Sequence, residues 1–321
     1  MTAIPVRQNR IALNAIQWIN IKADPTNPDS EDLWRYADPT FRADYPGVLA
    51  EIRRSGFSAV MMEVLATQTL QDFGRMIADS GLELAPGYVG VPIPRDHGVT
   101  LAKGTGERIR WFDLVRRRAE ESNTVGLETV FIAPEVSWEP GFVRTLDAVG
   151  VGAGFDQGRL DEQIEFVGEA ASILQAEGVR AGLHNHVGTW IETEDEIEQT
   201  LAAIPADLLG ASFDIGHLAW AGIDPVEMIM RHSDRVVDLH IKDLDMAIAD
   251  ASRETPTSYR KATDSGIFLE PGLGTLDIVG SLAALPADFD GWVIVEVDRA
   301  SMDPSASADV SWKWVAENVP A

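Results

Sequence analysis

The sequence has no cysteine among its 321 residues. Disulfide bonds, thiolate nucleophiles, cysteine-ligated zinc and iron–sulfur clusters are therefore excluded. Basic residues are also scarce, because 26 Lys and Arg stand against 51 Asp and Glu, for a formal net charge of −25. Since nucleic-acid binding needs clustered Lys and Arg, this excess of acid argues against a nucleic-acid partner and against an anionic membrane surface.

Long apolar runs are absent as well. No stretch approaches the ~20 apolar residues that span a bilayer. The opening segment MTAIPVRQNRIALNAI lacks the basic region, apolar run and cleavage site of a signal peptide. We therefore expect no membrane partner and a cytoplasmic location. Hydrophobic residues still make up 45% of the chain, which is enough to build a large core.

Short apolar runs alternate with longer helical patterns from end to end, as is typical of a parallel sheet covered by helices. Two helix starts are well marked, by the capping-box pattern of Thr193–Glu196 and by Asp224 before Pro225. Eight runs are predicted as strands: Ile11–Ile16, Ser58–Glu63, Glu83–Gly87, Thr129–Pro134, Arg180–His186, Gly210–Asp214, Val236–Ile241 and Trp292–Val297. Eight strand–helix units predict an α/β fold, a (β/α)8 TIM barrel that forms a single domain over residues 1–321.

Two segments interrupt this rhythm, Asn20–Phe41 and Leu244–Gly274. Loops this long in a compact domain are usually lids, binding loops or oligomer arms. We expect both on the C-terminal face of the barrel.

Four of the six histidines, His184, His186, His217 and His240, lie at or just beyond the ends of predicted strands, where barrel active sites are built. Three carboxylates, Asp214, Glu296 and Asp298, hold equivalent positions. Because side chains alternate between the two faces of a strand, these groups can converge at one mouth. Several buried ionisable groups need a compensating ion, and imidazole with carboxylate suits a divalent metal. His97 and His232 lack this setting and are interpreted as surface or packing residues.

Five segments carry a family resemblance: Leu183–Thr189 (LHNHVGT), Asp214–His217 (DIGH), His240–Asp243 (HIKD), Phe268–Gly274 (FLEPGLG) and Gly291–Glu296 (GWVIVE). Together they resemble the motifs of the xylose-isomerase-like TIM barrels of the sugar phosphate isomerase/epimerase type, and most closely those of the inosose dehydratase branch. The early segment Ile16–Asn20 (IQWIN) resembles a Trp-containing segment of the same family. The resemblance spans nearly the whole chain.

The resemblance implies an enzyme with one divalent metal ion, Mn²⁺ or Co²⁺ in the first place and Mg²⁺, Fe²⁺ or Zn²⁺ as alternatives. Its implied ligands are Asp214, His240 and Glu296. The fourth ligand stays open, because His184 stands where many relatives have glutamate. Either His184 binds the metal, or Glu135 or a water fills that place.

Other residues near the mouth are candidates for catalysis and substrate binding. His186 and His217 can act as the base, and Lys242 can steady a developing oxyanion. Glu63 and Glu135 can bind hydroxyls or act as a second acid or base, or simply end their strands. Three tryptophans, Trp18, Trp138 and Trp220, offer faces to a sugar ring or serve as packing.

The leading hypothesis is a dehydratase-type lyase that eliminates a β-hydroxyl from a cyclic keto-polyol or keto-sugar through a metal-stabilised enediolate. The second is a ketose epimerase or isomerase. A third is the large subunit of a C-glycoside deglycosidase, which pairs with a small subunit; otherwise a homo-oligomer is expected. A non-catalytic sugar-binding barrel is the alternative from another class, whereas a metal-dependent endonuclease of this fold conflicts with the acidic charge.

Overall fold

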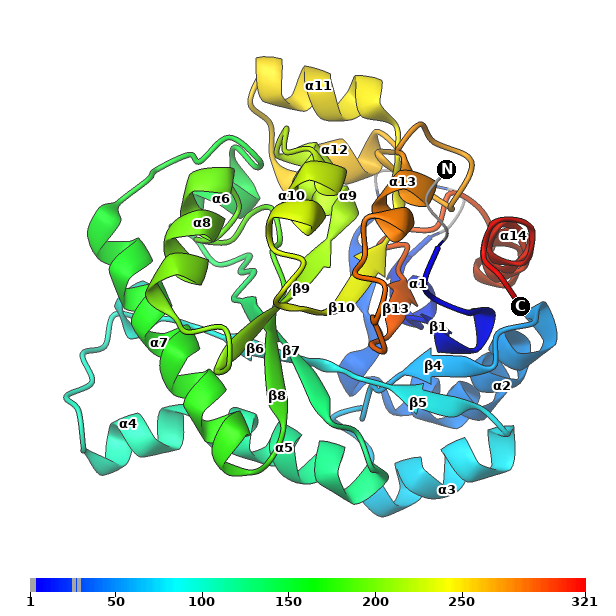
Figure 1. Ribbon diagram of the computed structural model, residues 1–321, viewed down its shortest axis with the longest axis horizontal. Coiled ribbons are helices and arrows are strands. Elements are labelled where there is room, and N and C mark those ends of the chain that lie inside the picture. The colour runs from blue at the N-terminus through cyan, green and yellow to red at the C-terminus, as the bar shows by residue number, and fades with distance from the viewer. Residues whose placement is uncertain (1–3, 25–26, 28–29) are drawn as a thin grey trace.

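A curled sheet of nine strands forms the centre of this computed structural model, which describes residues 4–24, 27 and 30–321 (Figure 1). All of its paired strands run parallel, in the order β5-β4-β1-β13-β10-β9-β8-β7-β6. The strands are β1 (Ile11–Leu13), β4 (Ala59–Met61), β5 (Glu83–Ala85), β6 (Tyr88–Val91), β7 (Thr129–Pro134), β8 (Arg180–Leu183), β9 (Leu209–Asp214), β10 (Val236–Ile241) and β13 (Val293–Val295). This α/β barrel confirms the predicted fold class.

The third barrel strand departs from the prediction, because it is broken into β5 and β6 by Pro86 and Gly87. Proline has no N–H for the ladder, and a Cβ on Gly87 would lie 2.3 Å from the backbone oxygen of Met62. The chain bends here, so that β5 pairs with β4 and β6 pairs with β7. The bend places Tyr88, the first residue of β6, inside the barrel next to Phe131.

Helices cover the outer face of the sheet (Figure 1). They are α2 (Pro39–Ser55), α3 (Leu70–Ser80), α4 (Gly106–Trp111), α5 (Asp113–Val125), α7 (Gln157–Ala176), α8 (Glu194–Ala203), α10 (Pro225–Arg231), α13 (Ile278–Ala283) and α14 (Pro304–Asn318). The predicted capping box is confirmed, since Thr193 and Glu196 each accept the other's backbone N–H. Among the described residues, no helix combines the length and the apolar composition that crossing a membrane requires.

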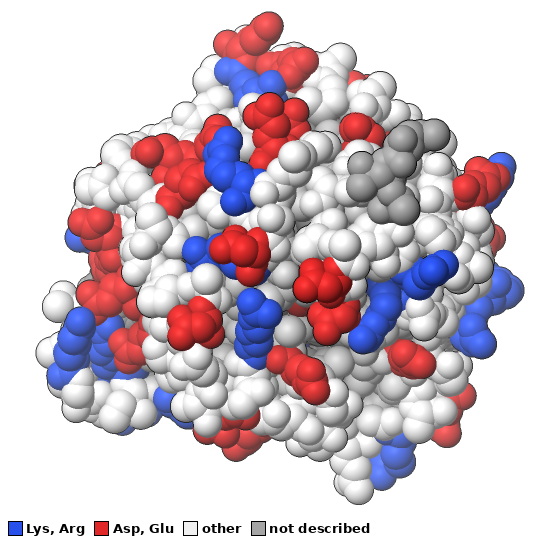
Figure 2. All heavy atoms as spheres, viewed as in Figure 1, with Lys and Arg blue, Asp and Glu red and all other residues white. Residues whose placement is uncertain are grey.

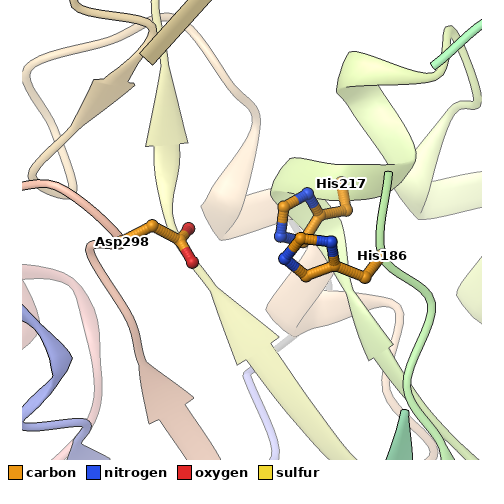
Figure 3. Close-up of side chains that lie close together, drawn as sticks. All are labelled: His186, His217 and Asp298. Atoms are coloured by element: carbon orange, nitrogen blue, oxygen red, sulfur yellow. The ribbon is translucent and has the colours of Figure 1, made fainter. Parts of the chain in front are cut away.

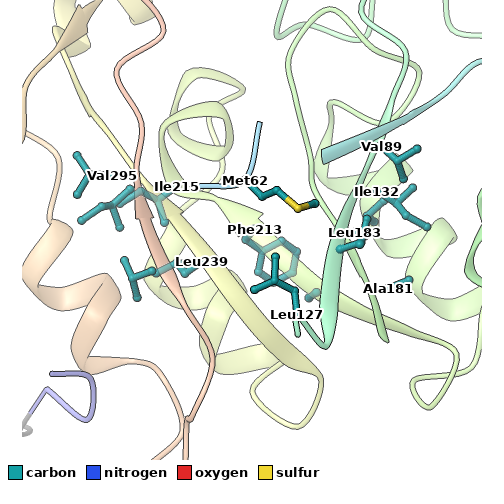
Figure 4. Packing of buried hydrophobic residues seen from close by; sticks show 14 of the residues in the cluster. Met62, Val89, Leu127, Ile132, Ala181, Leu183, Phe213, Ile215, Leu239 and Val295 are labelled. Atoms are coloured by element: carbon teal, nitrogen blue, oxygen red, sulfur yellow. The ribbon is translucent and has the colours of Figure 1, made fainter. Parts of the chain in front are cut away.

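The alternation of side chains gives the strands an apolar outer face and an inner face that combines a small apolar cluster, including Met61, Phe131 and Ile294, with polar residues. Ile132, Leu183, Phe213, Leu239 and Val295 are fully buried in the main core, where Figure 4 shows them packed together. Their neighbours in the chain, among them His184, Asp214, His240 and Glu296, therefore point toward the barrel axis. Burial and alternation thus position the polar residues at one end of the barrel.

The two interrupting segments contain secondary structure of their own. Leu244–Gly274 contains two helices, α11 (Met246–Glu254) and α12 (Tyr259–Asp264). Its strand β12 (Phe268–Leu269) pairs antiparallel with β11 (Asp243–Leu244), which begins one residue before the segment. It packs over the barrel through a separate apolar cluster that includes Trp220, Tyr259 and Phe268. Asn20–Phe41 forms a second antiparallel pair, β2 (Asn20–Lys22) and β3 (Asp32–Trp34), although residues 25–26 and 28–29 lie outside the described part.

Candidate functional site

Three of the predicted ligands form one donor group. One donor atom each of His184, Asp214 and Glu296 lies within 4.8 Å of the other two, and all three side chains are buried. They come from the ends of β8, β9 and β13. His240 is the register partner of Asp214, and its ring centroid lies 4.6 Å from that of His184. The structure therefore places all four predicted ligands at the same end of the barrel, with His240 beside the three-residue group.

The hydrogen-bond capacity of this group is not satisfied by the described protein atoms. His184 Nδ1 and both ring nitrogens of His240 are buried without a hydrogen-bond partner. Burial raises the pKa of Asp214 to about 7, and repulsion from Glu296 and Asp298 adds to this although Lys242 opposes it. Unpaired imidazole nitrogens beside crowded carboxylates are the donors that a divalent cation would satisfy. The residues present therefore fit a metal ion.

Lys242 lies at the centre of the site. Its ammonium Nζ is 3.0 Å from Asp214 Oδ2 and 3.2 Å from Glu296 Oε2, and it also donates to Asp298. Burial disfavours the charged amine, but these carboxylates outweigh that effect and hold the pKa of Lys242 well above its usual value. Gly216 of the DIGH motif makes room for this chain, because a Cβ there would lie 2.2 Å from Lys242 Cγ. The glycine of the motif is therefore needed for the Lys242 side chain to pass at this position.

A second donor group lies on the other side of Lys242 and consists of His186, His217 and Asp298 (Figure 3). The two imidazole centroids are 3.7 Å apart, and Figure 3 shows both rings facing Asp298. His186 Nδ1 donates to the carbonyl of Val187 at 2.6 Å, which leaves a lone pair on Nε2. Burial lowers the pKa of His186 to about 4 and that of His217 well below its usual value. Both imidazoles are therefore neutral near pH 7.

Comparison with known proteins identifies the family of this chain. A family model described as xylose isomerase-like TIM barrel matches residues 49–317. The chain belongs to this family. It is similar to an inosose dehydratase of Geobacillus kaustophilus (strain HTA426), with 27% identity over 274 residues and 84% of each chain covered. It is also similar to the rhizopine catabolism protein MocC of Rhizobium meliloti, with 35% identity over 136 residues, which are 42% of this chain and 41% of that protein.

Solved structures of low sequence identity share the fold of this xylose isomerase-like barrel. A D-allulose 3-epimerase from Methylomonas sp. in complex with D-allulose gives a TM-score of 0.65 at 13% identity, covering 99% of this chain and 100% of that one. A Mycobacterium smegmatis xylose isomerase-like TIM barrel protein in complex with magnesium gives 0.64 at 17% identity, covering 99% and 98%. The predicted family resemblance is thus confirmed. The chain is a sugar isomerase/epimerase-like barrel with candidate metal-binding groups.

The two further predicted carboxylates, Glu135 and Glu63, belong to neither donor group. Glu135 Oε2 is 2.7 Å from His97 Nε2, so that this histidine, interpreted as surface or packing, pairs with a predicted site residue. Glu63 lines a cavity of about 250 Å³ together with Tyr36, Tyr88 and others. Burial raises the pKa of Glu63 to about 7, with Arg118 opposing the shift and Glu121 adding to it.

We expect the substitution Glu63→Gln to stabilise the protein at alkaline pH. The folded-state pKa of about 7 lies above the usual 4.5, so the folded state binds the proton more tightly and loses stability as pH rises through this range. Since Glu63 is partly exposed, the gain at pH 8 should be on the order of 1–2 kcal/mol, vanishing below pH 4.5. Thermal denaturation across pH measures it, with the exposed Glu139→Gln as control. A difference that does not vary with pH would contradict this interpretation.

The three predicted tryptophans have different surroundings. Trp18, on α1 (Ile16–Ile19), is buried and donates to Glu51 Oε2 at 3.1 Å. Trp138 is half-exposed and meets Tyr259 edge to face at 5.5 Å. Trp220, on α9 (Ile215–Trp220), is fully buried, and its ring is nearly parallel to that of His217 at 6.3 Å. The structure therefore brings Trp220 to the second donor group and places Trp18 in the core.

Sequence reasoning missed several residues of the site. Tyr88 donates to Glu296 at 2.9 Å, and its hydroxyl lies 3.5 Å from His184 Nε2. Tyr259 stacks on His186 at 5.6 Å, and Phe268 meets His217 at 6.1 Å. Tyr88 follows a Pro-Gly pair where the strand was expected to end, and the other two belong to a segment interpreted as a loop. Phe268 begins the FLEPGLG segment that carries the family resemblance, whereas no sequence motif pointed to Tyr88 or Tyr259.

Proposed function

We propose that this chain is a divalent-metal-dependent lyase that removes water from a cyclic keto-polyol, with an inosose as the model substrate. The observation that carries the proposal is the pair of donor groups on either side of Lys242: one fits a metal, and the other holds two neutral imidazoles. The similarity to an inosose dehydratase over 84% of the chain supports the choice of substrate class.

In this proposal His184, Asp214 and Glu296 hold the metal, and His240 completes the set. Mixed nitrogen and oxygen donors favour Mn²⁺ or Co²⁺, with Mg²⁺, Fe²⁺ and Zn²⁺ as alternatives. A bound ion supplies Lewis acidity that polarises the ketone carbonyl of the substrate.

The protein's own residues then move the protons. His186 accepts a proton at Nε2 from the carbon next to the carbonyl, since Nδ1 is already held by Val187. Lys242 donates hydrogen bonds to the enediolate oxygen that gains negative charge. His217 carries its proton on Nδ1 and gives it to the departing hydroxyl, while its Nε2 accepts a proton from the Lys242 ammonium 3.3 Å away, so that no imidazolate forms. The C–H and C–O bonds break, a C=C bond forms and water leaves, and the proton held by His186 then returns to Lys242 and restores the starting charges.

The aromatic residues above the histidines keep water out. Trp220, Tyr259 and Phe268 are buried in one apolar cluster that lies against the second donor group. Excluding bulk water strengthens the electrostatic interactions of Lys242 and protects a reactive intermediate. We assign this role to Trp220 on α9 together with the Leu244–Gly274 segment.

Ketose epimerisation is the second candidate, because return of the proton to the opposite face of the same carbon would invert its configuration without loss of a hydroxyl. The imidazoles of His186 and His217 lie next to each other, and both face Asp298 (Figure 3). That arrangement favours loss of a proton and a hydroxyl from the same side of a ring over proton exchange between two opposite faces. We therefore favour elimination over epimerisation as the reaction of this site.

A panel of an inosose, a free ketose and a 3-keto C-glycoside distinguishes these functions. We expect the inosose to give the ultraviolet chromophore of a dione or enone. Solvent deuterium incorporation without loss of water would instead establish an epimerase, and release of a phenolic aglycone would establish a deglycosidase. Tight binding of a sugar without turnover of any substrate would establish a binding protein.

We expect Tyr88→Phe to weaken metal binding. The phenol hydrogen-bonds Glu296 at 2.9 Å and restricts the orientation of its carboxylate. Loss of such a supporting contact typically costs about 10- to 100-fold in metal affinity. Competitive titration with Co²⁺ and a chromophoric chelator measures the effect, and Tyr45→Phe, another buried tyrosine, is the control. Equal affinity in the two variants would refute this role.

A further inference from the structure

A large cavity opens at the end of the barrel opposite the donor groups. It has a volume of about 640 Å³ and is lined by the first residues of several strands, including Thr129, Arg180 and Val236. Because the strands are parallel, these residues lie at the other end of the barrel from His184 and Glu296. A cavity of this size falls in the range of small-molecule sites.

The inner wall of the cavity contains a buried carboxylate, Asp238, whose capacity to accept hydrogen bonds is only partly used. Asp238, on β10, is fully buried, and its Oδ1 accepts the backbone N–H of Trp292 at 2.7 Å. Its second oxygen, Oδ2, has no partner within hydrogen-bond distance among the described atoms, although the side chain of Thr129, which also lines the cavity, interacts with this carboxylate closely enough to oppose the rise that burial causes in its pKa. Its register partner Ser212 is equally buried, and its Oγ also has none. Buried polar atoms in native proteins are nearly always paired, so a donor from outside the chain is expected here.

Two arginines line the same cavity. Within the described part of the chain, neither Arg10 nor Arg180 has a carboxylate at ion-pair distance, although acidic residues outnumber basic ones 51 to 26. The guanidinium of Arg10 is held 4.9 Å over the ring of Trp292. Two unpaired guanidinium groups at one cavity suit a carboxylate, which they can bind through charge-assisted hydrogen bonds.

We propose that this cavity binds a small hydroxy-carboxylate. Its carboxylate lies between Arg10 and Arg180, and one of its hydroxyls donates to Asp238 Oδ2. A simple anion would bring no hydroxyl to Asp238 Oδ2 and would be repelled by that carboxylate, whereas a neutral polyol would leave both exposed guanidinium groups with water alone as their partner. Glu128 and Asp290 at the cavity edge disfavour ligands of higher negative charge. A molecule with one carboxylate and several hydroxyls satisfies both requirements.

Calorimetric titration of the purified full chain with D-gluconate tests the proposal. D-glucitol, which lacks the carboxylate, and acetate, which lacks the hydroxyls, are the matched probes. We expect gluconate to bind about tenfold or more tightly than either. The double substitution R10Q/R180Q should remove this preference, while Arg54→Gln, an exposed arginine on α2, should keep it.

Two measurements locate the binding site. Gluconate should protect residues 126–129, 178–180 and 290–292 from hydrogen exchange, because these segments line the cavity. Glu296→Gln should retain gluconate binding, since the cavity is separate from the metal-binding candidates. The proposal is overturned if gluconate binds no better than glucitol, if R10Q/R180Q binds it as well as Arg54→Gln does, or if Glu296→Gln abolishes binding.

Discussion

Replacing Asp214 with asparagine is expected to abolish both metal binding and turnover while leaving the fold intact. Asparagine can still accept the backbone N–H of His217, which Asp214 Oδ1 accepts at 3.0 Å. The substitution removes one of the three carboxylates that surround Lys242. Repulsion between these carboxylates in the metal-free protein therefore decreases. Losing the Lewis acid removes several kcal/mol of transition-state stabilisation, which corresponds to about a thousandfold or more in kcat.

Elemental analysis, steady-state kinetics and circular dichroism together measure this outcome. Asp224→Asn is a matched control, because Asp224 caps α10 far from the site and asparagine caps equally well. Glu296→Gln should behave like Asp214→Asn. If either variant retains one metal per chain and near-normal turnover, the assignment of these ligands is wrong.

The second large effect is expected from His186→Gln and His217→Gln, which should lower kcat by about 10²- to 10⁴-fold while leaving the metal bound. Neither histidine belongs to the donor group of His184, Asp214 and Glu296. The two variants should differ in solvent deuterium exchange into the substrate. His186→Gln should abolish exchange, because the base is missing, whereas His217→Gln should retain exchange and lose only dehydration.

His232→Gln provides the control for these two variants, since His232 is half-buried at the end of α10, outside the barrel interior, and pairs with Glu198 at 3.0 Å. Stopped incubations in deuterium oxide followed by mass spectrometry report exchange and dehydration separately. Should both variants keep kcat within tenfold of the parent, the two imidazoles do not carry the protons. If His186→Gln and His217→Gln show the same deuterium exchange, the base and the acid are not separate residues as assigned here.

The barrel could be predicted from the sequence because its strands are short apolar runs with clear ends. Thr129–Pro134 and Val236–Ile241 match β7 and β10 residue for residue. The break in the third strand could not be predicted, because the bend at Pro86 and Gly87 depends on a close approach to Met62. Met62 is distant in the sequence, so the local hydrophobic pattern does not report this contact. The helices of Leu244–Gly274 were missed because their short amphipathic turns resemble a polar loop.

The donor groups could be predicted in part. Side-chain alternation places His184, Asp214 and Glu296 on the inner face, and the structure brings them together. The sequence does not give the distances between strands, so it cannot predict which donor atoms lie close to one another. The central position of Lys242, and the contact of Tyr88 with Glu296, follow from packing across the barrel rather than from spacing along the chain.

The central claim is that turnover of an inosose depends on a metal held by His184, Asp214 and Glu296. The most direct test follows the dione or enone chromophore with protein that has been exhaustively chelated, verified as metal-free by elemental analysis, and then reloaded with Mn²⁺ or Co²⁺. We predict no turnover after chelation and recovery on addition of about one ion per chain. Full activity in the verified metal-free protein would contradict the account.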